Sequence, residues 1–178
     1  CIRDRDSILN MQTPVGKEIG TAGYYAATVD HSIRAELTVT ERTGMARYTF
    51  SSKEKQGTVI IGGGVAATSI QVAAIKITGP HSCEGYAEGG AFCGIPTPYK
   101  VYFVAEFDAD AESFGTWKEE RLHANHTFAE GSHSGVYFTF PLKEGNQAVQ
   151  YKIGVSYVSV ENARENLRVE NPAWDFSA

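Results

Sequence analysis

Two acidic residues near the middle of the chain, Glu106 and Asp108, lie two positions apart in a run of alternating apolar residues. Because alternate residues of a strand share a face, the two carboxylates are expected to lie side by side. Two such groups are what a glycosidase needs to hydrolyse a glycosidic bond. The polar face of an ordinary strand has the same pattern, and we favour that structural interpretation.

Histidines and glycines are the other residues that could form a metal-binding or phosphate-binding site. None of the histidines has a second ligand pair at a spacing typical of zinc sites. Gly62-Gly63-Gly64 follows an apolar run, but no Lys-Ser or Lys-Thr pair comes after it, as a phosphate-binding loop requires. We interpret the glycines as a turn or bulge with unusual backbone angles, and the histidines as loop residues. The histidines are His31, His81, His123, His126 and His133.

A stretch rich in Gly and Pro, residues 79–98, is predicted to be one long loop. Loops of this length inside compact domains are usually functional or disordered. Tyr86, Phe92 and Tyr99 could offer apolar faces to a sugar ring there, and a purely structural loop is an equal alternative. Cys83 and Cys93 could close the loop as a disulfide in an exported protein. Their spacing alone does not decide between a disulfide and two free thiols.

The elements around this loop are predicted from a hydrophobic period of two. In the segment 69–78 the apolar pattern slips phase at Ala73-Ala74, which predicts a bulge. No strand–helix–strand alternation occurs, so the chain is predicted to be all-β, an antiparallel β-sandwich. The expected strands are residues 33–40, 45–50, 58–61, 69–78, 99–108, 115–123, 135–140 and 148–158.

After the last predicted strand the sequence becomes polar and favours a helix. Ser159 is the expected N-cap, and Ala163 and Leu167 form one thin apolar seam. A short helix with such a seam is marginal unless it packs on another element. We expect residues 1–158 to form the sandwich, with a truncated start. Residues 159–178 are expected to be a linker helix and tail that lead to a domain outside this chain.

Composition narrows the class of protein. The chain has 178 residues, of which 42 % are hydrophobic and 21 % charged, values that are ordinary for a soluble globular domain. The formal net charge is −5 and the basic residues are scattered, which argues against nucleic-acid binding. No apolar run approaches the roughly 20 residues of a membrane span, so no membrane partner is expected.

Several segments, taken in order, resemble glycoside hydrolase family 92, the calcium-dependent exo-acting α-mannosidases. One is residues 33–50, around Thr43-Gly44-Met45, and another joins Ala91-Phe92-Cys93-Gly94 to residues 99–108 and 114–117. A third is residues 153–167. Their order and approximate spacing hold over nearly the whole chain. The sequence departs from the family at Ala46, where His is common, and at Gly62–Gly64, where an Asp-containing stretch is common.

The resemblance implies that this chain is the N-terminal β-sandwich domain, of the supersandwich type, of a secreted or periplasmic enzyme. An (α/α)6 barrel outside the chain would carry the catalytic acid, the base and the calcium ligands. The whole enzyme would hydrolyse terminal α-mannosides with inversion, α-1,2 linkage being the commonest. Its partners would be mannose-containing glycans and its own catalytic domain.

Under this resemblance no catalytic or metal-binding residue is assigned to the chain, which is expected to be inactive alone. The predicted substrate-binding residues are Phe92, Cys93 and Gly94, as one wall of the substrate pocket. The alternative from another class is a stand-alone carbohydrate-binding or interaction module without catalysis.

Overall fold

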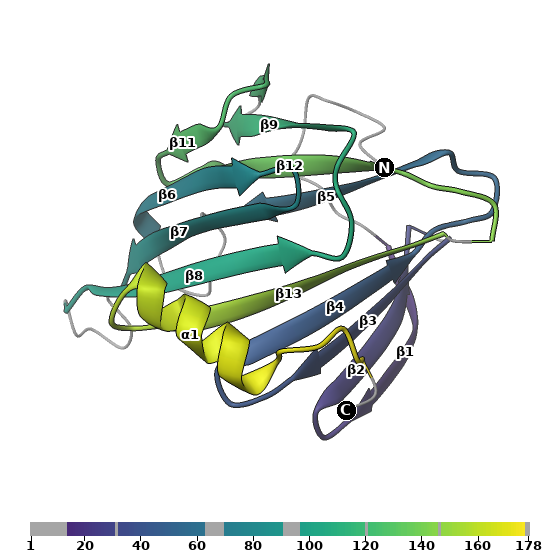
Figure 1. The fold of residues 1–178 in the computed structure, drawn as a ribbon, viewed down its shortest axis with the longest axis horizontal. Coiled ribbons are helices and arrows are strands. Elements are labelled where there is room, and N and C mark those ends of the chain that lie inside the picture. Colours follow the sequence, from purple (N-terminus) through teal and green to yellow (C-terminus); the bar gives the residue numbers. More distant parts are fainter. Residues whose placement is uncertain are drawn as a thin grey trace.

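The computed structural model describes residues 14–30, 32–62, 70–90, 97–119, 121–145 and 147–176. These residues form two antiparallel sheets and a helix, α1, which confirms the predicted all-β sandwich with a short C-terminal helix (Figure 1). The elements are β1 (Val15–Thr21), β2 (Tyr24–Val29), β3 (Ile33–Val39), β4 (Thr43–Thr49), β5 (Gln56–Gly62), β6 (Ile70–Gly79), β7 (Ser82–Gly89), β8 (Tyr99–Phe107), β9 (Ser113–Lys118), β10 (Arg121–Ala124), β11 (Phe128–Glu130), β12 (Ser134–Pro141), β13 (Ala148–Ser156) and α1 (Val160–Glu170).

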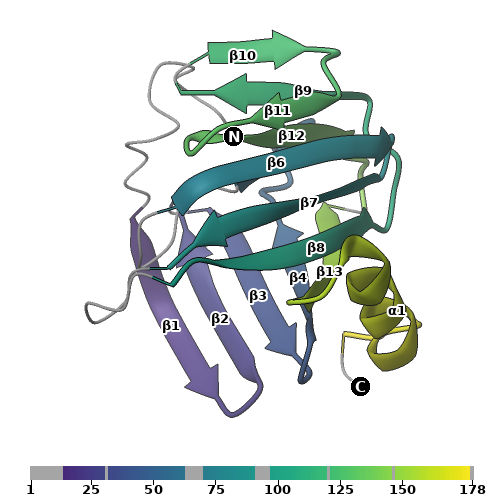
Figure 2. The same cartoon turned by 90° about the vertical axis from the view of Figure 1, so that its left-hand side faces the viewer.

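The two sheets differ in size. The larger has the strand order β1-β2-β3-β4-β13-β8-β7-β6-β11, and the smaller has the order β10-β9-β12-β5. In Figure 2 the smaller sheet lies at the top of the view near β6, whereas β1 to β3 form the opposite end of the larger sheet. The strong twist that such large sheets take turns β1 to β4 away from the direction of β6 to β8.

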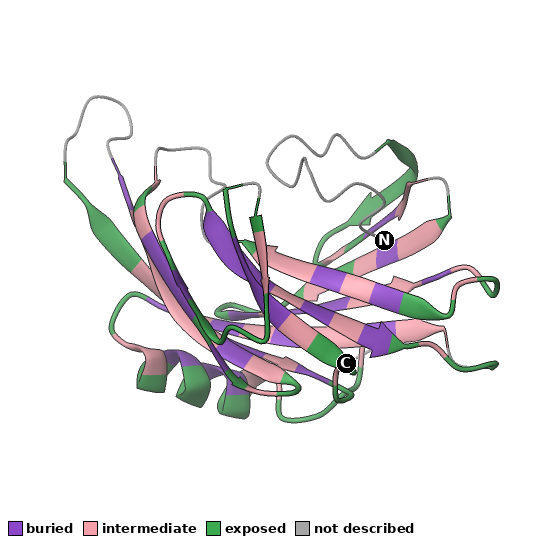
Figure 3. Cartoon of the chain, turned by 90° about the horizontal axis from the view of Figure 1, so that it is seen from above, coloured by how far each residue is buried: buried purple, intermediate pink, exposed green. Residues whose placement is uncertain are grey.

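The main core lies between the two sheets. Phe107 of β8 is its centre, with ring centroids 4.9 Å from Phe138 and 4.8 Å from Phe140 on β12. Along β5 and β12 of the smaller sheet buried residues alternate with more exposed ones, as expected for strands with one face in a core (Figure 3). The buried members of this core are Phe50, Val59, Ile75, Ile77, Cys83, Phe103, Ala105, Phe107, Val136, Phe138, Phe140 and Val149.

The helix α1 packs on the outer face of the larger sheet, across β13 and β8. Ser159 is its N-cap, and the Ser159 hydroxyl accepts a hydrogen bond from the Asn162 N–H at 3.1 Å. Ala163 and Leu167 are buried against Val104 of β8, which confirms the predicted cap and seam. Gly154 of β13 makes this approach possible, because a Cβ there would be 2.3 Å from the Ala163 carbonyl oxygen.

The residues after the helix lie across the outer face of the larger sheet. Lys152 of β13 is only 6 % exposed; its Nζ donates to the Asn171 carbonyl at 3.1 Å and lies 4.8 Å from the Trp174 ring centre. Farther along, the Phe176 ring lies 4.4 Å from the Arg47 guanidinium and meets Tyr24 edge-on. The segment 171–176 therefore follows the sheet from β13 to β2 instead of leaving it.

The exposed edge of the larger sheet, β1, is irregular. All seven of its residues are exposed. Its register with β2 shifts between Gly16 and Ile19, and Lys17 between them has a φ of 49°. An extra residue with a left-handed backbone is the mark of a β-bulge.

Several predicted elements need correction. The predicted strand 115–123 is two strands, β9 and β10, because the chain turns at Glu119 with a φ of 54°. The predicted bulge at Ala73-Ala74 is wrong, since the register shifts of β6 lie at Ile70/Val72 and Ile77/Gly79. The strands β1, β2, β7 and β11 were not predicted.

The glycines after β5 also need correction. Gly62 belongs to the strand, and the described part of the turn prediction is wrong there; Gly63 and Gly64 lie outside the described residues. A Cβ at Gly62 would be 3.0 Å from the Trp117 ring, and one at Gly135 would be 2.5 Å from Trp117 Nε1. The two glycines therefore make room for the indole, whose buried Nε1 has no hydrogen-bond partner among the described residues.

Candidate functional site

The predicted substrate-binding residues Phe92, Cys93 and Gly94 lie in the β7–β8 connection, outside the described residues. The ends of this connection are described and lie close together. Gly89 pairs with Tyr99, and a Cβ at Gly90 would be 2.6 Å from the Thr97 carbonyl oxygen. Gly90 has a φ of 148°, so the chain there uses a backbone that favours glycine. The role of Phe92, Cys93 and Gly94 stays a prediction.

An exposed aromatic pair stands beside these ends. The Tyr99 and Tyr157 ring centroids are 6.0 Å apart, and the side chains are 46 % and 74 % exposed. Val158, next along the chain, is also 74 % exposed. Tyrosine combines a large apolar ring with a polar hydroxyl, which suits it to contact sugars or a second protein surface. We call Tyr99, Tyr157 and Val158 the aromatic patch.

Tyr86 does not join this patch. It pairs with Tyr102 across β7 and β8, and the two ring centroids are 6.1 Å apart. Tyr102 and Tyr99 are three positions apart on one strand, so they point to opposite faces of the sheet. The Lys100 ammonium packs on Tyr86 instead: its Nζ lies 4.8 Å from the centre of the Tyr86 ring and 3.3 Å from the Glu88 carboxylate. The prediction that Tyr86 and Tyr99 line one sugar-binding loop is therefore wrong.

The segment that was predicted to be a loop contains β7, and Cys83 lies on that strand. The thiol is free and fully buried in the main core, and burial raises its pKa to about 12. The disulfide alternative with Cys93 is therefore wrong, because Cys83 faces the space between the sheets. The sequence concealed β7 because Gly85 interrupts its pattern. A Cβ at Gly85 would be 2.1 Å from the Ala74 carbonyl oxygen, which only glycine avoids.

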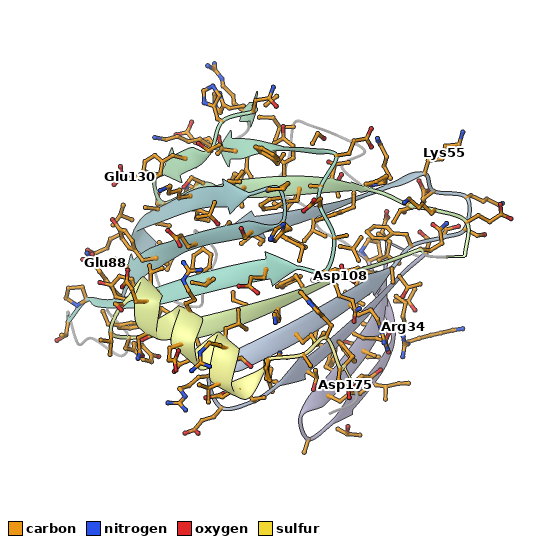
Figure 4. The ribbon with its side chains drawn as sticks, viewed as in Figure 1. Arg34, Lys55, Glu88, Asp108, Glu130 and Asp175 are labelled. Carbon is orange, nitrogen blue, oxygen red and sulfur yellow. The ribbon has the colours of Figure 1, made fainter. Side chains whose placement is uncertain are left out.

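The carboxylates Glu106 and Asp108 have structural partners. Asp108 accepts hydrogen bonds from the backbone N–H and side-chain amide of Gln150 at 3.0 and 3.2 Å. Glu106 lies 3.8 Å from the Lys152 ammonium. Glu88 pairs with Lys100 near the start of β8, whereas Asp108 follows the other end of that strand and is hence far from the β7–β8 connection (Figure 4). These contacts support the interpretation as a polar strand face rather than a glycosidase pair.

One cavity lies at the open edge of the sandwich, where β6 and β11 face β9 and β10. Its volume is about 550 Å³. It was not predicted, because its residues come from four strands and two connections between strands and form no sequence motif. The lining residues are Val72, Thr116, Lys118, His123, His126, Phe128, Ala129, Glu130 and Gly131.

Within the described ranges, no group of three or more His, Cys, Asp and Glu side chains is arranged to hold a metal ion. His81 forms a hydrogen bond with Asp110, whose carboxylate oxygen lies 2.7 Å from His81 Nδ1. No helix in the described part of the chain is long and apolar enough to cross a membrane.

Solved structures share this fold. The family GH92 α-mannosidase BT3965 from Bacteroides thetaiotaomicron superposes with a TM-score of 0.79 at 21 % identity, over 92 % of this chain and 23 % of its own. The family GH92 inverting mannosidase BT2199 from Bacteroides thetaiotaomicron VPI-5482 gives a TM-score of 0.79 at 22 % identity, over 92 % of this chain and 21 % of its own. The chain thus spans less than a quarter of either enzyme. No curated protein matches the chain by sequence.

The family assignment rests on the sequence itself. The model of the glycosyl hydrolase family 92 N-terminal domain matches residues 3–156, which is most of the 178 residues. Its span ends at the last residue of β13, just before the helix. The chain therefore belongs to glycoside hydrolase family 92, as an N-terminal domain of that family.

Proposed function

We propose that this chain is the N-terminal sandwich domain of an exo-acting α-mannosidase that removes terminal α-mannosides with inversion, with α-1,2-linked mannose as the first substrate to test. The match of residues 3–156 to the family domain carries this proposal. Similar folds form part of enzymes whose names describe α-mannosidase or inverting mannosidase activity. The partners of the whole enzyme would be mannose-containing glycans, and its location secreted or periplasmic.

The proposed division of labour follows from what the chain contains. Residues 1–158 would form the sandwich domain, and residues 159–178 would lead to an (α/α)6 catalytic domain. The docked helix and the segment 171–176 support a fixed exit for the chain, because both pack on the larger sheet. The chain would support the barrel and supply one wall of the substrate pocket.

The pocket wall would be Phe92, Cys93 and Gly94. The closely spaced ends of their connection and the neighbouring Tyr99–Tyr157 pair support this placement. Calcium would be held by the catalytic domain. The described residues of this chain offer it no cluster of three ligands, and we assign them no step that involves the ion.

An assay of the 178-residue chain tests the division of labour. The purified chain would be incubated with an aryl α-mannoside and with α-1,2-mannobiose, with and without calcium, and compared with the full enzyme. We expect turnover only by the full enzyme. Turnover by the isolated chain well above background would show that catalytic groups lie within it, and the proposal would fail.

The second candidate is a stand-alone carbohydrate-binding module, which the exposed aromatic patch favours. NMR titration of the chain with mannose and mannobiose separates the two functions. Saturable shifts of Tyr99 and Tyr157 would favour autonomous binding. An open reading frame that continues for several hundred residues past Ala178 would favour the enzyme, and a stop codon would favour the module.

A further inference from the structure

Two histidines of the cavity are held side by side by a tight turn. The His126 N–H donates to the His123 carbonyl at 3.4 Å, and Asn125 within the turn has a φ of 61°. The Asn125 N–H donates to the Phe114 carbonyl of β9 at 3.1 Å, which fixes the turn to the smaller sheet. The ring centroids of His123 and His126 are 5.3 Å apart, with 30° between the ring planes.

This separation matches a pair of imidazoles bound to one metal ion. Zn–N bonds of about 2.1 Å at a tetrahedral angle put two ring centroids about 5 Å apart. The side-chain torsion next to a histidine ring is broad, so the rings can rotate until one nitrogen of each points to a common centre. Because the turn is anchored, the two histidine backbones are already held close together before a metal ion binds.

The surroundings leave room for the other ligands. Both rings line the cavity of about 550 Å³, which is large enough for water to complete the coordination shell. The Glu130 carboxylate lines the same cavity and offsets positive charge, whereas the Lys118 ammonium there opposes it. Glu130 is the last residue of β11, at the edge of the sandwich (Figure 4).

We propose that His123 and His126 form a two-imidazole site for a divalent transition-metal ion, with water in the remaining positions. Imidazole nitrogen favours Zn²⁺, Ni²⁺ and Cu²⁺, whereas Ca²⁺ prefers oxygen ligands. The site goes beyond the proposed mannosidase function and does not involve the calcium of the whole enzyme. With two protein ligands the site is open to solvent and to a further ligand.

The test is a titration with Zn²⁺ alone. The titration is best done on a Cys1→Ser, Cys93→Ser variant, because cysteine thiolates also bind zinc. We expect zinc to shift the ¹⁵N NMR resonances of the His123 and His126 imidazoles in a saturable manner. Calcium should leave these resonances unchanged.

Variants then decide which residues bind. His123→Gln and His126→Gln should each weaken zinc binding by about tenfold or more, as loss of a metal ligand requires. His133→Gln is the matched control, because His133 is an exposed histidine outside the cavity lining, and it should bind as the parent does. Melting curves without metal check that each variant folds. Unchanged affinity in both cavity variants, or zinc shifts confined to other histidines, would overturn the proposal.

Discussion

Gly154 is predicted to control the docking of α1, and substitution to Ala is the smallest change that tests it. An added Cβ would lie 2.3 Å from the Ala163 carbonyl oxygen and 2.8 Å from Leu167 Cβ. Because ordinary carbon contacts need about 3.5 Å, the helix would have to move away by roughly 1 Å. The contact atoms belong to the helix backbone and the first carbon of a side chain, so no rotamer change can relieve the overlap.

The cost follows from what the displacement exposes. Overpacking a well-packed site costs typically about 1–3 kcal/mol. Complete undocking would expose Leu167, which is 2 % exposed in the structure, and burial of a leucine is worth about 1.5–3 kcal/mol. Both routes predict a loss of about 2 kcal/mol, or a melting temperature lower by roughly 4–8 °C for a domain of this size.

The assay is urea and thermal unfolding of Gly154→Ala, together with amide hydrogen exchange in α1. An isolated helix of 11 residues is marginal, so an undocked α1 should exchange faster than the sheets. Gly16→Ala is the matched control, because no atom lies within 4 Å of a Cβ at that strand glycine. If Gly154→Ala unfolds within about 0.5 kcal/mol of the parent and protects α1 equally, the close-approach argument is refuted.

The remaining predictions concern single groups. Cys83, in a variant without the other cysteines, should react with a thiol reagent at pH 8 only on unfolding, because burial raises its pKa to about 12; rapid reaction of the native protein would contradict this. The pKa of Glu170 is lowered, first by the Thr40 hydroxyl and the Arg42 backbone N–H, from 4.5. Its contribution to stability is therefore complete above the ordinary pKa and lost as pH falls below it. Glu170→Gln should unfold at lower urea at pH 7 and show a flatter acid dependence below pH 4.5; an unchanged acid profile would contradict this. Lys152→Met should free the segment 171–176 and increase acrylamide quenching of Trp174 fluorescence, and equal quenching in parent and variant would show that Lys152 does not hold the segment.

Much of the fold could be predicted because several strands alternate strictly between apolar and polar residues. The segment of β13 is an example, since Val149 and Tyr151 pack in the main core while Lys152, which follows them, points to the outer face. The helix was equally clear from Ser159 and the seam of Ala163 and Leu167. These patterns report burial directly, and burial decides the structure there.

The rest depends on contacts that a local pattern does not contain. β7 has glycine where the backbone of β6 comes close, so its alternation is weak although its pairing with β8 is regular. Tyr86 and Tyr99 lie on opposite faces of the sheet, which follows only from the pairing of β7 with β8. His123 and His126 have no motif around them, and only the turn and the facing sheet give them a common cavity.

The bulge at Lys17 has a consequence for how the protein behaves in a crowded solution. A long, flat edge strand offers a row of free N–H and C=O groups on which another chain can add a strand. In β1 the left-handed Lys17 breaks that row, and a bulge and an exposed lysine are both features by which proteins protect an edge strand. The opposite edge of the sheet, β11, has only three residues and offers little to pair with. Among the described strands, both edges of the larger sheet are thus poor templates for β-aggregation.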